Sequence, residues 1–154
     1  MVALEQLRIS PDVTDDGVGE LRVPEATLAD MLVHVAAGLP NEACGVLAGD
    51  GSTVMAHYAT ANAASTPRTF SEIAPLEVLR IWNEIDAHDW QVLAYYHSHP
   101  ETPAYPSPRD ILWSRGWPGT YYIIFSLAEP LAPVVRAFLI SGEEVREDRL
   151  IVVP

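Results

Sequence analysis

The chain has 154 residues, of which 49% are hydrophobic and 19% charged, and its formal net charge is −12. This composition indicates one folded domain with a substantial core and excludes an intrinsically disordered chain. The acidic balance argues against nucleic-acid binding, because that depends on Lys and Arg neutralising phosphates. It favours a partner with a basic patch, or serves solubility alone.

Neither a secretion signal nor a membrane span is predicted. The N-terminus lacks a basic segment followed by an apolar run, and charges and prolines interrupt the most apolar region, residues 121–140. Cys44 is the single cysteine, so an internal disulfide is ruled out and a reducing cytoplasm is the expected location. The oligomeric state stays open, a homodimer included.

Residues 1–19 are expected to form an N-terminal extension or edge hairpin, and residues 20–154 the main domain. Hydrophobic spacing and turn signals predict helices over about 24–38, 75–88 and 107–115. They predict strands near 21–23, 44–50, 53–59, 91–96, 120–127, 134–140 and 145–153. In the second helix the expected apolar positions are Leu76, Leu79, Ile81, Trp82 and Ile85. Strands and helices mixed in this order predict an α/β or α+β sandwich.

The segment HSHPETPAYPSPRD, residues 97–110, concentrates the chemistry of the chain. His97 and His99 stand two residues apart at a predicted strand end, so both imidazoles leave the same face. Asp110, in the first turn of the next predicted helix, would complete the three-ligand set of a catalytic zinc site. Two plainer interpretations remain open. The histidines can be hydrogen-bonded near a sheet edge, and Ser107 with Asp110 can simply cap the helix.

Glu42 precedes the strand predicted at 44–50 and is a candidate general base, since zinc hydrolases need a carboxylate that is not itself a ligand. A solvated loop glutamate is the alternative. Cys44 is expected to pack in the core, where free cysteine is common. His34, His57 and His88 have no ligand neighbours in sequence and are expected to be ordinary surface or partly buried residues.

Glu42, His97-Ser98-His99-Pro100, Ser107 and Asp110 together match the pattern of the JAMM (MPN+) metalloproteases, which residues 20–150 resemble. The resemblance implies a curved mixed β-sheet flanked by helices, a JAMM/MPN (cytidine deaminase-like) sandwich. It implies Zn²⁺ held by His97, His99 and Asp110, and Glu42 passing a proton from the metal-bound water to the leaving amine. Ser107 would hold the polarised carbonyl, and Ser98 would face away and be structural.

Three further segments are similar to the short prokaryotic, Mec-like branch of that family: NEACGVLAG at 41–49, Thr60-Ala61-Asn62-Ala63, and AYPSPRD at 104–110. This resemblance implies hydrolysis after the C-terminal Gly-Gly of a ubiquitin-like sulfur-carrier protein, with release of cysteine. Two alternatives stand beside it. One is a JAMM peptidase acting on another small peptide, and the other is a metal-free MPN scaffold. The intact ligand set argues against the scaffold.

Overall fold

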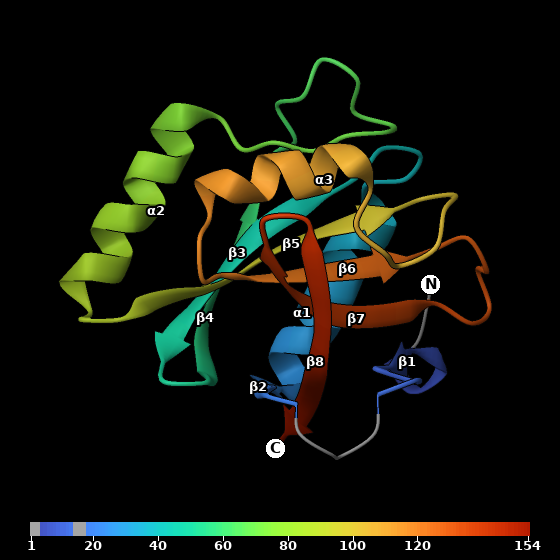
Figure 1. The fold of residues 1–154 in the computed structure, drawn as a ribbon, viewed down its shortest axis with the longest axis horizontal. Coiled ribbons are helices and arrows are strands. Elements are labelled where there is room, and N and C mark those ends of the chain that lie inside the picture. Colours follow the sequence, from blue (N-terminus) through green and yellow to red (C-terminus); the bar gives the residue numbers. More distant parts are fainter. Residues whose placement is uncertain (1–3, 14–17) are drawn as a thin grey trace.

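The computed structural model of the chain describes residues 4–13 and 18–154. The strands in these ranges are β1 (Arg8–Ile9), β2 (Glu20–Pro24), β3 (Cys44–Asp50), β4 (Thr53–Thr60), β5 (Gln91–His99), β6 (Tyr121–Ser126), β7 (Val134–Ser141) and β8 (Glu144–Val153). They form one mixed sheet in the order β1-β7-β6-β5-β3-β4-β2-β8, and β8 also pairs with β7. The sheet therefore curls until β8 contacts both β2 and β7 (Figure 1).

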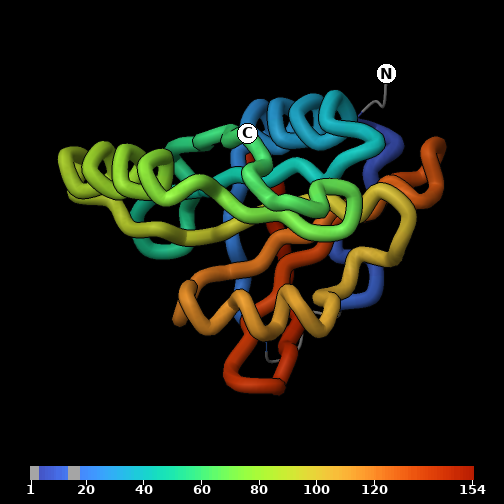
Figure 2. The backbone as a smooth tube through the Cα atoms, turned by 90° about the horizontal axis from the view of Figure 1, so that it is seen from above, coloured from blue at the N-terminus to red at the C-terminus, as the bar shows by residue number. Residues whose placement is uncertain are grey.

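Helices cover both faces of the sheet. They are α1 (Glu25–Ala37), α2 (Pro75–Ala87) and α3 (Pro108–Trp113), with short 3-10 turns η1 (Leu4–Gln6) and η2 (Ser114–Gly116). Figure 2 shows α1 and α3 on opposite sides of the strands. None of the helices in the described ranges has the length and apolar character needed to cross a membrane.

Two hydrophobic clusters fill the space between the sheet and these helices. The cluster under α1 includes Leu28, Met31, Leu32 and Val35, whose spacing is that of one helix face. The second cluster includes Ile81 and Ile85 of α2 on the other side of the sheet. Burying both faces requires strands that are apolar throughout, and this explains the unbroken apolar run of β3 and most of β5.

The central strand β5 divides its side chains between the two faces. Tyr96 belongs to the cluster under α1, and Tyr95 to the cluster under α2. Because strand side chains alternate, His97 and His99 share the face of Tyr95. Gly45 on β3 makes room for the Tyr96 ring, since a Cβ there would lie 2.4 Å from a ring carbon.

The predicted fold class is confirmed, with a few differences in detail. Strand β5 continues through His99, so the histidines lie inside the strand and not beyond its end. Of the apolar positions expected in α2, Leu76 and Leu79 do not face the core: they are 81% and 57% exposed. The extension predicted over residues 1–19 falls partly outside the described residues, and its β1 pairs in parallel with β7.

Candidate active site

Three elements meet at one end of the sheet, two of them consecutive in the chain and the third far from them in sequence. The end of β5 supplies His97 and His99, the start of α3 supplies Asp110, and the residues entering β3 supply Glu42. Strands β3 and β5 are antiparallel, with Cys44 opposite His97. Continuing that register brings Glu42 opposite His99, on the same face of the sheet.

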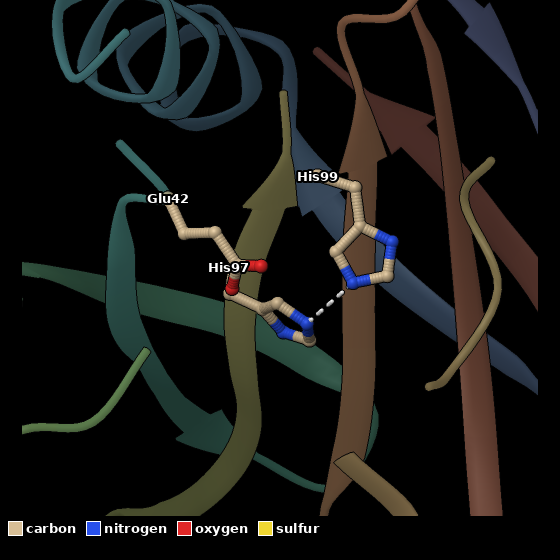
Figure 3. Close-up of side chains that lie close together, drawn as sticks. All are labelled: Glu42, His97 and His99. Atoms are coloured by element: carbon tan, nitrogen blue, oxygen red, sulfur yellow. Dashed lines mark hydrogen bonds between the residues drawn. The ribbon is translucent and has the colours of Figure 1, made fainter. Parts of the chain in front are cut away.

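The two imidazoles and the carboxylate of Asp110 form a tight triangle. The Nε2 atoms of His97 and His99 lie 3.1 Å apart (Figure 3). Each lies 3.2 Å from Oδ2 of Asp110. All three residues are buried, with His97 fully so. The spacing of the motif therefore does bring its three candidate ligands together.

Asp110 has a second set of contacts in the start of α3. Its backbone N–H donates to Oγ of Ser107 at 3.1 Å, and the N–H of Ser107 donates to Oδ2 of Asp110 at 2.9 Å. This is a reciprocal capping box. Capping and ligation by Asp110 are compatible, and we expected them to use different oxygens. The structure corrects this expectation, because the same oxygen, Oδ2, serves the cap and faces both histidines.

Glu42 lies beside this triangle and is buried, with 5% of its surface exposed. The candidate donor atoms of Glu42, His97 and His99 lie within 4.8 Å of one another, a looser group than the triangle with Asp110. Oε1 of Glu42 has no hydrogen-bond partner among the described residues. The solvated-loop interpretation of Glu42 is therefore wrong, because its carboxylate is held in the interior of the site.

For both carboxylates, burial raises the pKa and the neighbouring histidine charges lower it, but a different effect prevails in each. Burial raises the pKa of Glu42 to about 6, although the charges of His97 and His99 lower it. Burial alone would also raise the pKa of Asp110. The charge of His97 and the hydrogen bonds from His97, His99 and the Ser107 N–H outweigh it and hold that pKa far below its ordinary value. Asp110 is thus a fixed anion, whereas Glu42 exchanges a proton near neutral pH.

The histidine tautomer suits a ligand. Nδ1 of His99 donates to the carbonyl of Pro103 at 2.8 Å, so the neutral ring presents the Nε2 lone pair to the triangle. Burial lowers the pKa of His99, but the hydrogen bond to Asp110 and the Pro103 carbonyl outweigh it, and the net direction is upward.

The donor set fits a divalent metal. Tetrahedral coordination with bonds of roughly 2.0–2.2 Å places neighbouring ligand atoms roughly 3.3–3.5 Å apart. The separations of 3.1–3.2 Å between His97, His99 and Asp110 are close to this. Without a cation, the Nε2 atoms need protons in order to donate to Asp110, and a bound metal would take the place of those protons. Glu42 is the outlying member, and its Oε1 has no hydrogen-bond partner among the described residues.

Residues with other expected roles lie where the sequence suggested. Ser98 points away from the triangle: its Oγ accepts from the N–H of Ala43, and its own N–H donates to the Ala43 carbonyl. Cys44 is fully buried, and burial raises the pKa of its thiol, so it is a core residue and not a nucleophile. His34 and His57 are half-buried and flank the hydroxyl of Tyr96 on the opposite face of the sheet.

Two polar neighbours of Glu42 have no role in the motif. The buried Ser71 hydroxyl lowers the pKa of Glu42, and its Oγ lies 2.7 Å from the Tyr95 hydroxyl. The amide of Asn62 donates to the Glu42 carbonyl at 2.9 Å. In the sequence, Asn62 was visible only within the Thr60-Ala61-Asn62-Ala63 turn, and Ser71 had no signal of its own.

Two imidazoles and two carboxylates lie buried together at the end of a central strand, and this arrangement is compatible with a bound metal. The family described as prokaryotic homologs of the JAB domain matches residues 24–140, and the chain belongs to that family. The resemblance to JAMM/MPN proteins is thereby confirmed.

The chain is similar to several peptidases. It is 40% identical over 89 residues to a desampylase of Haloferax volcanii, a match that spans 56% of this chain and less than two-thirds, 63%, of that relative. It is 34% identical to the CysO-cysteine peptidase of Mycobacterium tuberculosis, over 80% of this chain and 84% of the relative. A probable TtuB-protein conjugate cleaving protease of Thermus thermophilus is 36% identical, over 81% and 80%.

Solved structures agree with the fold. The solution structure of protein DSY2949 from Desulfitobacterium hafniense matches with a TM-score of 0.77 and 36% identity, covering 86% of this chain and 92% of that one. A JAB1/MPN domain protein from Archaeoglobus fulgidus matches with a TM-score of 0.57 and 20% identity, covering 87% and 100%. The second likeness concerns the fold alone.

The raised pKa of Glu42 predicts that Glu42→Gln stabilises the metal-free protein at high pH. A carboxyl whose pKa rises from 4.5 to about 6 on folding contributes stability that is full below pH 4.5 and is lost as the pH rises through about 6. The loss amounts to at most about 2 kcal/mol. In urea unfolding of chelator-treated protein, the variant should match the wild type at about pH 4, below the unfolded pKa, and exceed it at pH 8. Equal stability at both values would contradict the buried, proton-exchanging carboxyl.

Proposed function

We propose that this protein is a zinc-dependent peptidase that hydrolyses the bond after the C-terminal Gly-Gly of a ubiquitin-like or sulfur-carrier protein. Release of cysteine from a carrier–cysteine adduct is the reaction we favour. The observation that carries the proposal is the convergence of His97, His99 and Asp110 with a separate buried carboxylate, Glu42, beside them. A metal-free scaffold has no need of this arrangement.

His97, His99 and Asp110 would hold the zinc ion. Three protein ligands leave one coordination position open, as in catalytic zinc sites. Bound there, zinc would supply Lewis-acid polarisation of the scissile carbonyl and would acidify a water. Nitrogen and carboxylate donors also suit other divalent metals. Zinc is favoured here because three buried protein ligands at this spacing, with one open position, suit four-coordinate geometry.

The protein's own side chains would transfer the proton and stabilise the developing negative charge. Glu42 takes a proton from the attacking water and passes it to the leaving amine, tasks for which a carboxyl with a pKa of about 6 is suited. Ser107 already accepts a hydrogen bond from the Asp110 N–H, and a hydroxyl that accepts one can still donate one. Its hydrogen would stabilise the negative charge that develops on the carbonyl oxygen.

The substrate class follows from the relatives. Their names denote cleavage of conjugates of CysO with cysteine and of TtuB with proteins, and the third is a desampylase. The shared element is the carrier, and the leaving amine differs. A Gly-Gly tail suits a recessed centre, because glycine lets the backbone approach closely. The similarity to the mycobacterial peptidase covers most of both chains and supports cysteine as the leaving group.

Metal binding and base catalysis should separate in two variants. His99→Ala should lose both zinc and activity, since it removes a ligand. Glu42→Gln should keep one zinc per chain and lose roughly 10²–10⁴-fold in kcat, because it preserves shape but removes the proton acceptor. Elemental analysis and kinetics on the same preparations provide the test. Near-normal turnover of Glu42→Gln would remove Glu42 from the mechanism, and a wild type unable to take up zinc would refute the metal assignment.

Ser107→Ala should affect both stability and chemistry. Loss of the cap at the start of α3 should cost about 0.5–2 kcal/mol of unfolding free energy. Loss of the hydroxyl donor should lower kcat by roughly 10²–10³-fold. Ser107→Thr, which keeps a hydroxyl and an acceptable cap, is the matched control and should retain most of both. A destabilised Ser107→Ala with normal kcat would assign Ser107 to capping alone.

The substrate class can be tested with three probes: a CysO–cysteine adduct, a TtuB–protein conjugate and an unrelated peptide. Mass spectrometry should show the adduct cleaved, leaving a carrier with a free Gly-Gly end, and chelator should prevent it. A short peptide copied from the carrier tail should be cut with much lower kcat/KM, because binding to the folded carrier helps to position the bond. Cleavage of the unrelated peptide alone would favour the general-peptidase alternative.

A further inference from the structure

Asn62 lies just after β4, and its side chain makes an unusually complete set of hydrogen bonds to backbone groups. Nδ2 donates to the carbonyl of Glu42 at 2.9 Å and to that of Phe70 at 3.0 Å. A third, longer contact of 3.4 Å reaches the carbonyl of Pro67. Oδ1 accepts from the N–H of Ala64 at 3.0 Å and from that of Glu72 at 3.2 Å.

These contacts use the whole capacity of the amide. An asparagine side chain has two N–H donors and two acceptor lone pairs, and all four are engaged with backbone. Asn62 therefore has no polar group left for a substrate and would have to give up a bond to bind one. Its role must be exerted through the groups it holds.

The first of these groups is the peptide of Glu42. The Asn62 amide donates to the Glu42 carbonyl, and the N–H of Glu42 donates to the Pro67 carbonyl at 2.8 Å. Both backbone polar groups of Glu42 are therefore hydrogen-bonded to residues of the segment after β4. The next residue, Ala43, is tied to Ser98 of β5 by two hydrogen bonds. The backbone that carries the Glu42 side chain is thus fixed against the strand that bears the two histidines.

The second group is the stretch on either side of Ser71. Asn62 bonds the Phe70 carbonyl and the Glu72 N–H, which flank Ser71 directly. The Ser71 hydroxyl is near enough to the Glu42 carboxylate to lower its pKa, and its Oγ lies 2.7 Å from the Tyr95 hydroxyl. One amide therefore fixes both the backbone of Glu42 and the backbone on either side of a polar neighbour of its carboxylate.

We propose that Asn62 is the positioning residue for the catalytic base. Its amide fixes the backbone of Glu42 and of the residues around Ser71 relative to each other, so that the Glu42 carboxylate faces the water that attacks the substrate. The role rests on the proposed function, in which Glu42 moves the proton. Catalytic groups displaced by about an ångström can lose roughly 10²-fold in rate. A hydrogen-bonded amide at this point prevents such a displacement.

Three variants test the role, with kcat and KM measured on the CysO–cysteine adduct well below each unfolding temperature. Asn62→Ala removes every contact. Asn62→Asp keeps an acceptor for the N–H groups of Ala64 and Glu72 but has no donor for the carbonyls. Asn41→Ala is the matched control, since Asn41 adjoins Glu42 in the same turn and its side chain makes no hydrogen bond to the described part of the chain.

Both Asn62 variants should lose roughly 10²-fold in kcat with KM and zinc content near wild type, and Asn41→Ala should behave as wild type. A purely structural role would lower the unfolding temperature and leave the kcat of folded enzyme unchanged, and that result would overturn the proposal. Should Asn62→Ala fail to fold, Asn62→Asp decides by the same measurements.

A crystal structure of each zinc-loaded Asn62 variant provides a readout that does not depend on activity. The Glu42 carboxylate should be displaced from its wild-type position relative to His97 and His99, while those residues and Asp110 stay in place. An undisplaced carboxylate would overturn the proposal. If the wild type cleaves no carrier conjugate, the proposed function fails, and this structural comparison still decides whether Asn62 positions Glu42.

Discussion

A single carboxylate oxygen, Oδ2 of Asp110, joins the start of a helix to the end of the central strand. It lies 2.9 Å from the N–H of Ser107 and 3.2 Å from each of two imidazole nitrogens. Helix α3 has only six residues and would not persist alone. Its place therefore depends on this buried anion, and the anion depends on its donors, since an uncompensated buried charge costs several kcal/mol.

The two carboxylates of the site show how the same chemical group takes two roles. Asp110 is surrounded by donors and remains charged, as suits a ligand. Glu42 has an oxygen without a partner among the described residues, and burial raises its pKa to about 6. Environments that push two such pKa values apart distinguish the fixed anion from the proton carrier. The same burial makes the metal-free protein less stable, as is common for active sites.

The sequence predicted most of the fold because both faces of the sheet are covered and the strands are accordingly apolar. It placed His97, His99 and Asp110 together because they lie within one strand, loop and helix start. It could not place the exposed Leu76 and Leu79 correctly. Steps of three residues fall about 60° short of a full turn, so a run of apolar residues at that spacing rotates off the buried face. Ile81 and Ile85 are the buried residues of the helix, and Val78 and Trp82 pack against the same cluster while partly exposed.

Contacts between distant segments were beyond the sequence for a different reason. Glu42 is separated from His97 by more than fifty residues, and their proximity depends on the pairing of β3 with β5, which no local pattern specifies. Asn62 was visible only as part of a short turn motif. Its importance lies in backbone groups, and the sequence does not show which carbonyls a loop will bring together. A general base carried on a loop needs such an amide, because that part of the backbone has no strand partner of its own. Fixing the backbone leaves the carboxylate free to exchange its proton, and this is what a residue that must both accept and release a proton requires.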